Sequence, residues 1–256
     1  MRTITVTNQK GGTGKSTTAA AIGAGLLRNG YRVLFVDMDA QGDLSDTLEA
    51  DTSGLTTKGV MEVLEESATA QEAIQHTPHG DLIASSPTLT GADMVIIATG
   101  KEYRLREALE AVSGAYDYCI IDTPPALGIA TINALTASDS VIIPAKADYY
   151  SVKGIGKLYS SIRTVRKYCN PALKVEGILL TAYSSRTIIS RDMADMLEST
   201  AAMMETKVFS TKIRECSALR EAQAVHQDIY SYAPKSNASA DYTALVNEIE
   251  EGLSNG

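Results

Sequence analysis

The segment from Thr3 to Thr18 constrains the fold of this 256-residue chain more than any other. It opens with alternating β-branched residues, Ile4 and Val6, and continues through the run Lys-Gly-Gly-Thr-Gly-Lys-Ser-Thr-Thr, residues 10–18, into an alanine-rich stretch, residues 19–27. This order predicts a strand, a glycine loop and a helix. Glycines let successive backbone N–H groups turn inward without Cβ clashes, and the positive end of the new helix points to the same place. The segment therefore predicts a cradle for a polyphosphate.

Two lysines flank the glycines of this loop. Lys15 would reach the β- and γ-phosphates of a nucleotide, and the Ser16 hydroxyl would bind Mg²⁺. The general phosphate-loop pattern has a glycine where this chain has Gln9, and Lys10 opens the loop instead. This arrangement resembles the deviant Walker A motif of the ParA/MinD family of ATPases. The resemblance implies that Lys10 reaches across a dimer interface to the phosphates held by the other subunit. The loop residues predicted to bind ATP are Lys10, Gly11, Gly12, Thr13, Gly14, Lys15, Ser16 and Thr17.

Acidic residues end two apolar stretches that read as buried strands, residues 32–37 and 118–122. Ligands of open α/β folds bind at the carboxyl edge of the sheet, so Asp37, Asp39 and Asp122 are expected near the phosphate loop. An apolar strand closed by an acid is the Walker B arrangement, which predicts that Asp122 holds Mg²⁺ through water. We assign Asp37 to the metal site as well. By resemblance, Asp39 orients the attacking water; a solvated acidic turn is the competing interpretation of 37–42.

Strands and helices alternate along the chain. Further strands are expected at 81–84, 140–144, 175–181 and 208–213, and helices at 60–66, 70–75, 103–112, from after Tyr150 to about Tyr168, and 241–253. This order predicts an α/β fold, a doubly wound and mostly parallel sheet flanked by helices. Nothing resembles a linker or a low-complexity tract, so residues 1–256 are expected to form one domain.

Composition narrows the class of protein. The sequence has no signal-peptide pattern and no apolar run long enough to span a membrane, which favours a cytoplasmic protein. Its three cysteines are scattered without a C-x-x-C spacing, which argues against disulfides and zinc. His76 and His79 could bind a metal, but no third ligand is near in the sequence, so we expect ordinary loop residues.

Charge is distributed unevenly. The net charge is −8, yet residues 151–220 hold 12 basic and 6 acidic residues, a local excess of +6. Residues 1–150 hold 10 basic and 19 acidic residues, and residues 221–256 hold 1 and 6. This asymmetry permits a basic face on an acidic protein.

Beyond the loop, the chain resembles the short, Soj-type ParA proteins along nearly its whole length. The matches include the segments 37–42, 122–125, 132–141, 180–187 and 232–236. The resemblance implies an ATPase that forms ATP sandwich dimers, coats double-stranded DNA nonspecifically and is associated with the nucleoid when ATP is bound. Basal turnover is expected to be slow, because no arginine finger acting in cis is identifiable in the sequence. A ParB-type protein at a centromere-like site would stimulate hydrolysis. We expect no helix-turn-helix domain before the loop, because the strand that leads into the loop starts at residue 3.

One departure from the family pattern affects the base-binding region. Relatives usually read Ile-Pro-Arg-Asn where this chain has Ile213 followed by Arg214, Glu215 and Cys216. The departure leaves no residue-level match for the family's adenine-lining segment. We assign Arg214 to the nucleotide site as a substitute for the basic residue that relatives have in this region. For DNA, Arg186 matches a family contact position, and Arg191 and Arg220 are further candidates; solvated helix charges are the competing interpretation.

Three rival functions stay open at the level of sequence. A MinD-like, membrane-cycling ATPase would need a basic amphipathic C-terminal helix, whereas residues 241–256 contain no Lys or Arg. The sequence is also compatible with a protein-cargo positioning ATPase without DNA binding and with a non-enzymatic DNA-coating protein. Phosphate release from ATP would separate the DNA-coating protein from the ATPases.

Overall fold

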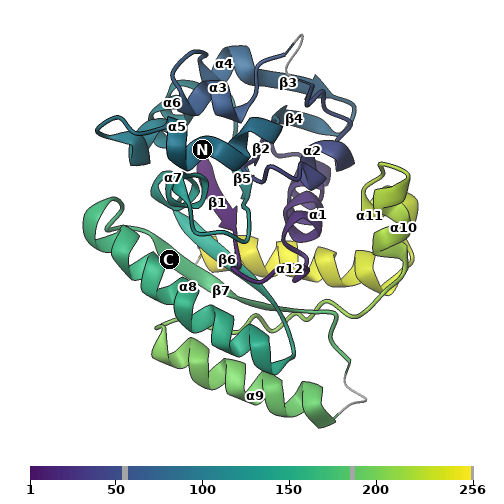
Figure 1. Ribbon diagram of the computed structural model, residues 1–256. Coiled ribbons are helices and arrows are strands. Elements are labelled where there is room, and N and C mark those ends of the chain that lie inside the picture. Colours follow the sequence, from purple (N-terminus) through teal and green to yellow (C-terminus); the bar gives the residue numbers. More distant parts are fainter. Residues whose placement is uncertain (54–56, 185–187, 255–256) are drawn as a thin grey trace.

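A computed structural model describes residues 1–53, 57–184 and 188–254 of the chain (Figure 1). Within these residues seven strands form one sheet in the order β3-β4-β2-β5-β1-β6-β7. Neighbouring strands run parallel except β3 and β4, which are antiparallel. The strands are β1 Arg2–Val6, β2 Val33–Asp37, β3 Ile74–Thr77, β4 Gly80–Ile83, β5 Tyr118–Asp122, β6 Ser140–Lys146 and β7 Lys174–Thr181. The predicted fold class is confirmed.

Helices cover both faces of the sheet (Figure 1). The longer ones are α1 Lys15–Arg28, α6 Arg104–Val112, α7 Ile129–Ala137, α8 Tyr149–Tyr168, α9 Ile188–Met203 and α12 Asn237–Ser254. The shorter ones are α2 Asp43–Thr47, α3 Val60–Leu64, α4 Ala70–Ala73, α5 Ala92–Val95, α10 Ala218–Ala224 and α11 Ile229–Tyr232, with 3₁₀ turns η1 Pro87–Gly91 and η2 Lys101–Tyr103.

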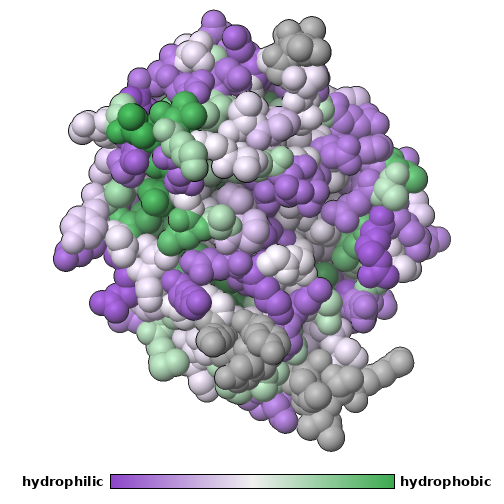
Figure 2. All heavy atoms as spheres, in the orientation of Figure 1, coloured by the Kyte–Doolittle hydropathy of each residue, from purple (hydrophilic) through white to green (hydrophobic). Residues whose placement is uncertain are grey.

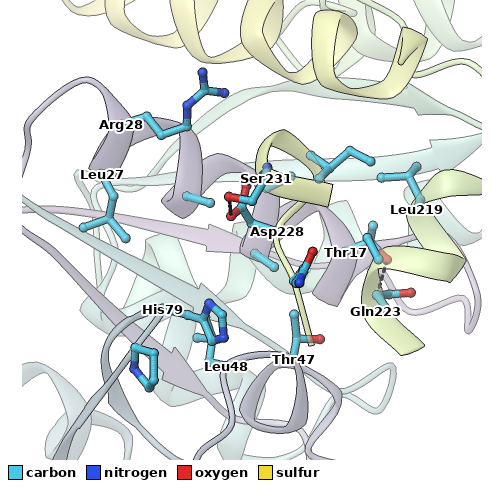
Figure 3. Close-up of a pocket in the computed structure, with 17 residues that line it drawn as sticks. Thr17, Leu27, Arg28, Thr47, Leu48, His79, Leu219, Gln223, Asp228 and Ser231 are labelled. Carbon is cyan, nitrogen blue, oxygen red and sulfur yellow. Dashed lines mark hydrogen bonds between the residues drawn. The ribbon is translucent and has the colours of Figure 1, made fainter. Parts of the chain in front are cut away.

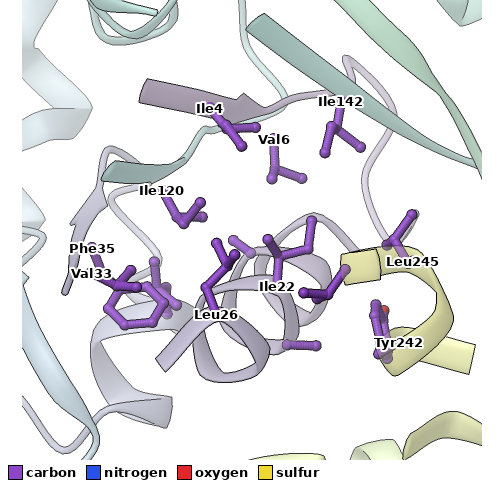
Figure 4. Close-up of a cluster of buried hydrophobic side chains, with 14 of the residues drawn as sticks. Ile4, Val6, Ile22, Leu26, Val33, Phe35, Ile120, Ile142, Tyr242 and Leu245 are labelled. Atoms are coloured by element: carbon purple, nitrogen blue, oxygen red, sulfur yellow. The ribbon is translucent and has the colours of Figure 1, made fainter. Parts of the chain in front are cut away.

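The hydrophobic core lies on both faces of the sheet, because successive side chains of a strand point to opposite faces. Side chains of β1, β2 and β5 that face α1 and α12 form one cluster, in which Ile4, Val6 and Ile120 pack against Ile22 and Leu26 (Figure 4). The alternate side chains of β2 and β5 pack against α3, α6 and α7 on the opposite face. Because both faces are covered, β2 and β5 are apolar along nearly their whole length.

Close packing of α1 on the sheet fixes where the phosphate loop lies. A Cβ atom added at Gly23 would lie 2.0 Å from the Phe35 ring, so only glycine allows α1 to approach β2 this closely. The helix begins directly after the loop, and its first residues therefore lie at the carboxyl edge of the sheet.

Two sequence predictions need correction. The sequence predicts that residues 74–75 end a helix, but Ile74–Thr77 forms β3, which turns back onto β4 with the Thr77 hydroxyl donating to the Gly80 carbonyl at 2.8 Å. It also predicts a strand at residues 208–213, but this segment follows β7 only in places, through one isolated bridge at Val208 and the amides of Phe209 and Ile213. The amides of Ser210 and Thr211 instead donate to the Glu248 carboxylate of α12, at 2.9 and 3.0 Å.

The two histidines fall in this hairpin region. His76 lies in β3, where its Nδ1 is 2.7 Å from an Asp81 oxygen. His79 Nε2 lies 3.6 Å from a Glu49 oxygen. Each ring thus faces one carboxylate.

Candidate nucleotide site

The loop between β1 and α1 has the backbone of a cradle. Gly12 and Gly14 have φ angles of 69° and 86°, a left-handed conformation that favours glycine. Space around Gly12 is open, since an added Cβ would have no neighbour within 4 Å. Thr13 is fully buried, and its carbonyl accepts a hydrogen bond from the Thr181 hydroxyl at 2.8 Å. The loop is therefore anchored to β7 while Gly11 and Gly12 face open space.

Cationic and hydroxyl groups follow at the start of α1. Lys15 is the first residue of the helix and is only 7% exposed. Ser16 is half-buried, and Thr17 accepts a hydrogen bond from Gln223 Nε2 of α10 at 2.9 Å. No acidic residue lies in the first turn of this fully described helix. The helix start is thus free to face an anion.

Two buried carboxylates lie side by side at the ends of β2 and β5. Asp37 and Asp122 are register partners, and both are fully buried. Asp37 accepts hydrogen bonds from the Ser45 amide and hydroxyl, at 2.8 and 2.7 Å. Burial raises the pKa of Asp37 to about 6, although the Ser45 hydrogen bonds oppose the shift and the Asp39 charge adds to it.

Asp122 is the less satisfied of the pair. Neither of its oxygens accepts a hydrogen bond of ordinary geometry from the described part of the chain. Burial, reinforced by the Asp37 charge, raises its pKa well above the usual range, and the nearby Ser16 hydroxyl and Lys15 oppose the shift only in part. A buried carboxylate without a partner is costly. Carboxylate and hydroxyl oxygens are ligands that Mg²⁺ prefers, so Asp122, Asp37 and Ser16 fit a magnesium site.

Asp39 lies just outside this buried pair. It is half-buried, its amide donates to Asp37 Oδ1 at 3.1 Å, and its own Oδ1 accepts from the Gln41 amide at 3.1 Å. The Asp39 carbonyl accepts a hydrogen bond from the Ser85 hydroxyl at the end of β4. The loop after β2 is thereby held at the carboxyl edge, with the Asp39 carboxylate partly open to solvent.

Lys10 is paired within its own subunit. Its Nζ lies 2.7 and 2.6 Å from the two oxygens of Asp148 and 3.4 Å from the Ser151 hydroxyl. Asp148 also caps α8 by accepting from the Ser151 amide at 2.9 Å. Burial alone would raise the pKa of Asp148, but the hydrogen bond and charge of Lys10 and the cap outweigh it and lower the pKa. The ion pair is partly exposed, with 30% and 37% of the two side chains accessible.

A cavity of about 360 Å³ joins the loop to the region after β7. Gly12, Gly14 and Thr17 line one end, and Arg214, Cys216 and Leu219 line the other. Arg214, which we predicted to bind nucleotide, does line this cavity, but its guanidinium is paired with Asp241 of α12, with Nε 3.0 Å from Oδ2. Its charge is therefore already matched.

A larger cavity, about 550 Å³, lies between α1 and α10 (Figure 3). It shares Thr17, Leu219 and Gln223 with the first, and its other walls come from α1, from the regions of α2 and α11, and from the β3–β4 turn at Pro78 and His79. No glycine of the phosphate loop lines it, whereas Gly12 and Gly14 line the smaller cavity. The smaller cavity is therefore the better match to a nucleotide, because the backbone of the phosphate loop faces it.

Comparisons of this chain with known protein families and relatives agree with a nucleotide site of this geometry. A family model, AAA_31, described as an AAA domain, matches residues 1–175. The sporulation initiation inhibitor protein Soj of Bacillus subtilis (strain 168) is 39% identical over 249 residues, which cover 96% of this chain and 97% of Soj. This chain belongs to the ParA/MinD family. The chromosome partitioning protein ParA of Myxococcus xanthus (strain DK1622) is 37% identical over 97% of this chain and 87% of that relative.

Solved structures give the same fold for this family member. A cobyrinic acid a,c-diamide synthase from Mycobacterium smegmatis, with a bound ATP analog and magnesium, is 34% identical with a TM-score of 0.85, covering 99% of this chain and 96% of that one. The septum site-determining protein MinD of Pyrococcus horikoshii, complexed with Mg-ADP, shares the fold at 22% identity and a TM-score of 0.79, covering 98% and 97%.

The structure does not test whether the arginines predicted to bind DNA share one face. Arg186 lies outside the described residues, and Arg191 lies in α9 with its side chain outside them. Arg220 is exposed in α10 and lines the nucleotide cavity. Exposed cations that the sequence alone did not single out for DNA lie along α8, namely Lys157, Arg163 and Lys167.

Sequence reasoning missed three groups that shape this site. They are Asp148, which holds Lys10; Ser45, which holds Asp37; and Thr181, which anchors the loop. An acid before a long predicted helix was a visible capping signal for Asp148, but nothing in the sequence linked it to a lysine 138 positions away. No helix of the described chain is long and apolar enough to cross a membrane.

Proposed function

We propose that this protein is a DNA-partitioning ATPase that forms an ATP-bound dimer and binds DNA without sequence preference. The observation that supports nucleotide binding is buried Asp122, whose oxygens accept no hydrogen bond of ordinary geometry from the described residues, near Lys15 and the glycine loop. The 39% identity to Soj and the 37% identity to a ParA protein support the partitioning role.

Each group of the site has a role in ATP binding. The loop amides and Lys15 would hold the β- and γ-phosphates, and Arg214 would form a wall of the cavity around the base rather than supply a free charge. Ser16, Asp37 and Asp122 would hold Mg²⁺, which when bound neutralises phosphate charge. Asp39 would orient the attacking water, since its carboxylate stays partly open to solvent beside the metal site.

Dimerisation is supported by the surface at the same edge of the sheet. Large apolar side chains are exposed on the connections that follow β4 and β5: Met94 of α5 by 86%, Ile97 just after α5 by 75%, and Leu127 by 44%. Apolar side chains gather on the face shown in Figure 2. An apolar patch beside a charged site is typical of an interaction surface. A second copy facing this edge would cover the patch and bring its own Lys10 to the phosphates.

This role requires Lys10 to change partners. In the single subunit its ammonium is held by Asp148, so ATP-driven assembly would exchange this ion pair for contacts with the other subunit's γ-phosphate. ADP lacks that phosphate, and the exchange would then be unfavourable. Basal ATP hydrolysis would be slow, and a partner protein of the ParB type would supply the stimulation.

DNA binding would depend on the basic middle of the chain. Exposed cations of α8, together with Arg186, Arg191 and Arg220, are the candidates, and a dimer doubles their number. Contacts to phosphates release counterions, so affinity should fall with salt with a log–log slope of about −0.9 per phosphate contacted.

The test is duplex DNA binding at low salt with ATP, ADP or no nucleotide, on two unrelated sequences. We expect binding only with ATP, equal on both sequences and lost as salt rises. Arg186→Ala should weaken binding to both equally and reduce the salt slope by about one. No binding with ATP would refute the partitioning role and leave a MinD-like or protein-cargo positioning ATPase. DNA binding that requires ATP would also separate this proposal from a diamide synthase, the activity in the name of one solved neighbour.

A further inference from the structure

Lys146 ends β6 directly beside the phosphate loop. It is the register partner of Thr181, whose hydroxyl donates to the Thr13 carbonyl at 2.8 Å. Side chains alternate along the strand: Ile143 and Ala145 pack on the side of α8 and α9, whereas Ile142 packs on the side of α1. Lys146 therefore extends to the side of α1, and it lines the nucleotide cavity.

The charge of Lys146 is not matched by a nearby acid. Asp148 is only two residues away, and its amide donates to the Lys146 carbonyl at 2.8 Å, but its carboxylate is held by Lys10. Across the described ranges no carboxylate forms an ion pair with Lys146, and its side chain is exposed. In the same cavity, Arg214 is already paired with Asp241.

We propose that Lys146 binds the phosphates of the nucleotide held in its own subunit, as a second cation beside Lys15. The inference rests on the proposed function, because it names a further residue of the same nucleotide site. An unpaired ammonium that lines the same cavity as Gly12 and Gly14 favours an oxyanion there, and charge-assisted hydrogen bonds to phosphate are among the stronger ones. The ligand is recognised through its phosphates, so a nucleoside without phosphates gains nothing.

Binding of ADP and of adenosine to the full chain, each with Mg²⁺, tests this by calorimetry. Lys146→Gln should raise the Kd for ADP about tenfold, equal to about 1.4 kcal/mol, and leave adenosine binding unchanged. The salt dependence of ADP binding should also become shallower. Lys146→Arg should keep most of the affinity, because it keeps the charge.

Lys174→Gln is the matched control. Lys174 is an exposed lysine of the neighbouring strand, but it lies at the opposite edge of the sheet, paired in register with Ser140. It should bind ADP as the wild-type protein does. Lys146→Met, which keeps the apolar stem, repeats the test if the Gln variant melts early.

Two results would overturn the inference. An ADP affinity within twofold of wild type in Lys146→Gln would show that Lys146 does not touch the nucleotide. Unchanged ADP binding with weaker ATP-driven dimerisation would place the lysine at the subunit interface instead. If the wild-type protein binds no ADP at all, the proposed function itself fails, which is a distinguishable outcome.

Discussion

Removing the negative charge that holds Lys10 should make the ATP-bound dimer tighter. Asp148→Asn keeps a side chain that can cap α8, since asparagine caps helices as well as aspartate does, but it no longer forms the ion pair with Lys10. Lys10 then enters the dimer without first losing a partner.

The magnitude follows from the exposure of the pair. With 30% and 37% of the side chains accessible, the ion pair belongs to the partly exposed class worth about 0.2–1 kcal/mol. A symmetric dimer breaks two such pairs, so the dissociation constant of the ATP-bound dimer should fall by about 2-fold to 30-fold.

The Lys10–Asp148 ion pair is fully formed at the neutral pH of the assay. The folded pKa of Asp148 is lowered, so the pair is complete above the unfolded value of about 4 and is lost only as pH falls through the lower folded value. Sedimentation equilibrium near neutral pH measures the dimer constant with ATP and ADP.

A matched control is Asp117→Asn. It breaks the Arg32–Asp117 pair, which is also partly exposed but lies at the opposite edge of the sheet. This variant should leave the dimer constant unchanged. An Asp148→Asn dimer that is no tighter than wild type with ATP would refute the idea that the pair competes with assembly.

Three further predictions concern the site and its support. Lys15→Ala should lose nucleotide binding and phosphate release, because it removes the buried cation at the start of α1; unchanged turnover would contradict the site. Asp122→Asn should stabilise the nucleotide-free protein but remove the stabilisation by Mg²⁺ and ATP, measured by thermal melting. Because the folded pKa of Asp122 is raised, its charge costs stability as pH rises above the unfolded value of about 4, so the variant's advantage should grow with pH and vanish in acid. Gly23→Ala should lose about 1–3 kcal/mol of unfolding free energy in denaturant titrations, since its Cβ would meet the Phe35 ring, while Gly114→Ala, with open space around it, should lose little.

Much of the site could be predicted from sequence because its groups follow strands. Asp37 and Asp122 each end an apolar strand. Parallel strands end at the same edge of the sheet, so the sequence predicted that both carboxylates lie at that edge, and the structure pairs them in register. The loop and Lys15 followed from glycines placed between a strand and a helix. These features depend on neighbours a few residues away.

Other features depend on contacts distant in sequence. The pairing of Lys10 with Asp148, the antiparallel β3 and the interrupted segment 208–213 each depend on a partner from another element. The amides of 210 and 211 could equally have bonded to β7, and the position of Glu248 on α12 decided otherwise. Local propensity contains no information about that choice.

Sedimentation velocity of Asp39→Ala and Lys10→Ala with Mg²⁺ and either ATP or ADP tests the central claim most directly. The account predicts that Asp39→Ala hydrolyses slowly and sediments as a dimer with ATP and as a monomer with ADP, whereas Lys10→Ala stays monomeric with both. An Asp39→Ala protein that remains a monomer with ATP, or a Lys10→Ala protein that dimerises as tightly as wild type, would contradict a nucleotide shared between two copies through Lys10.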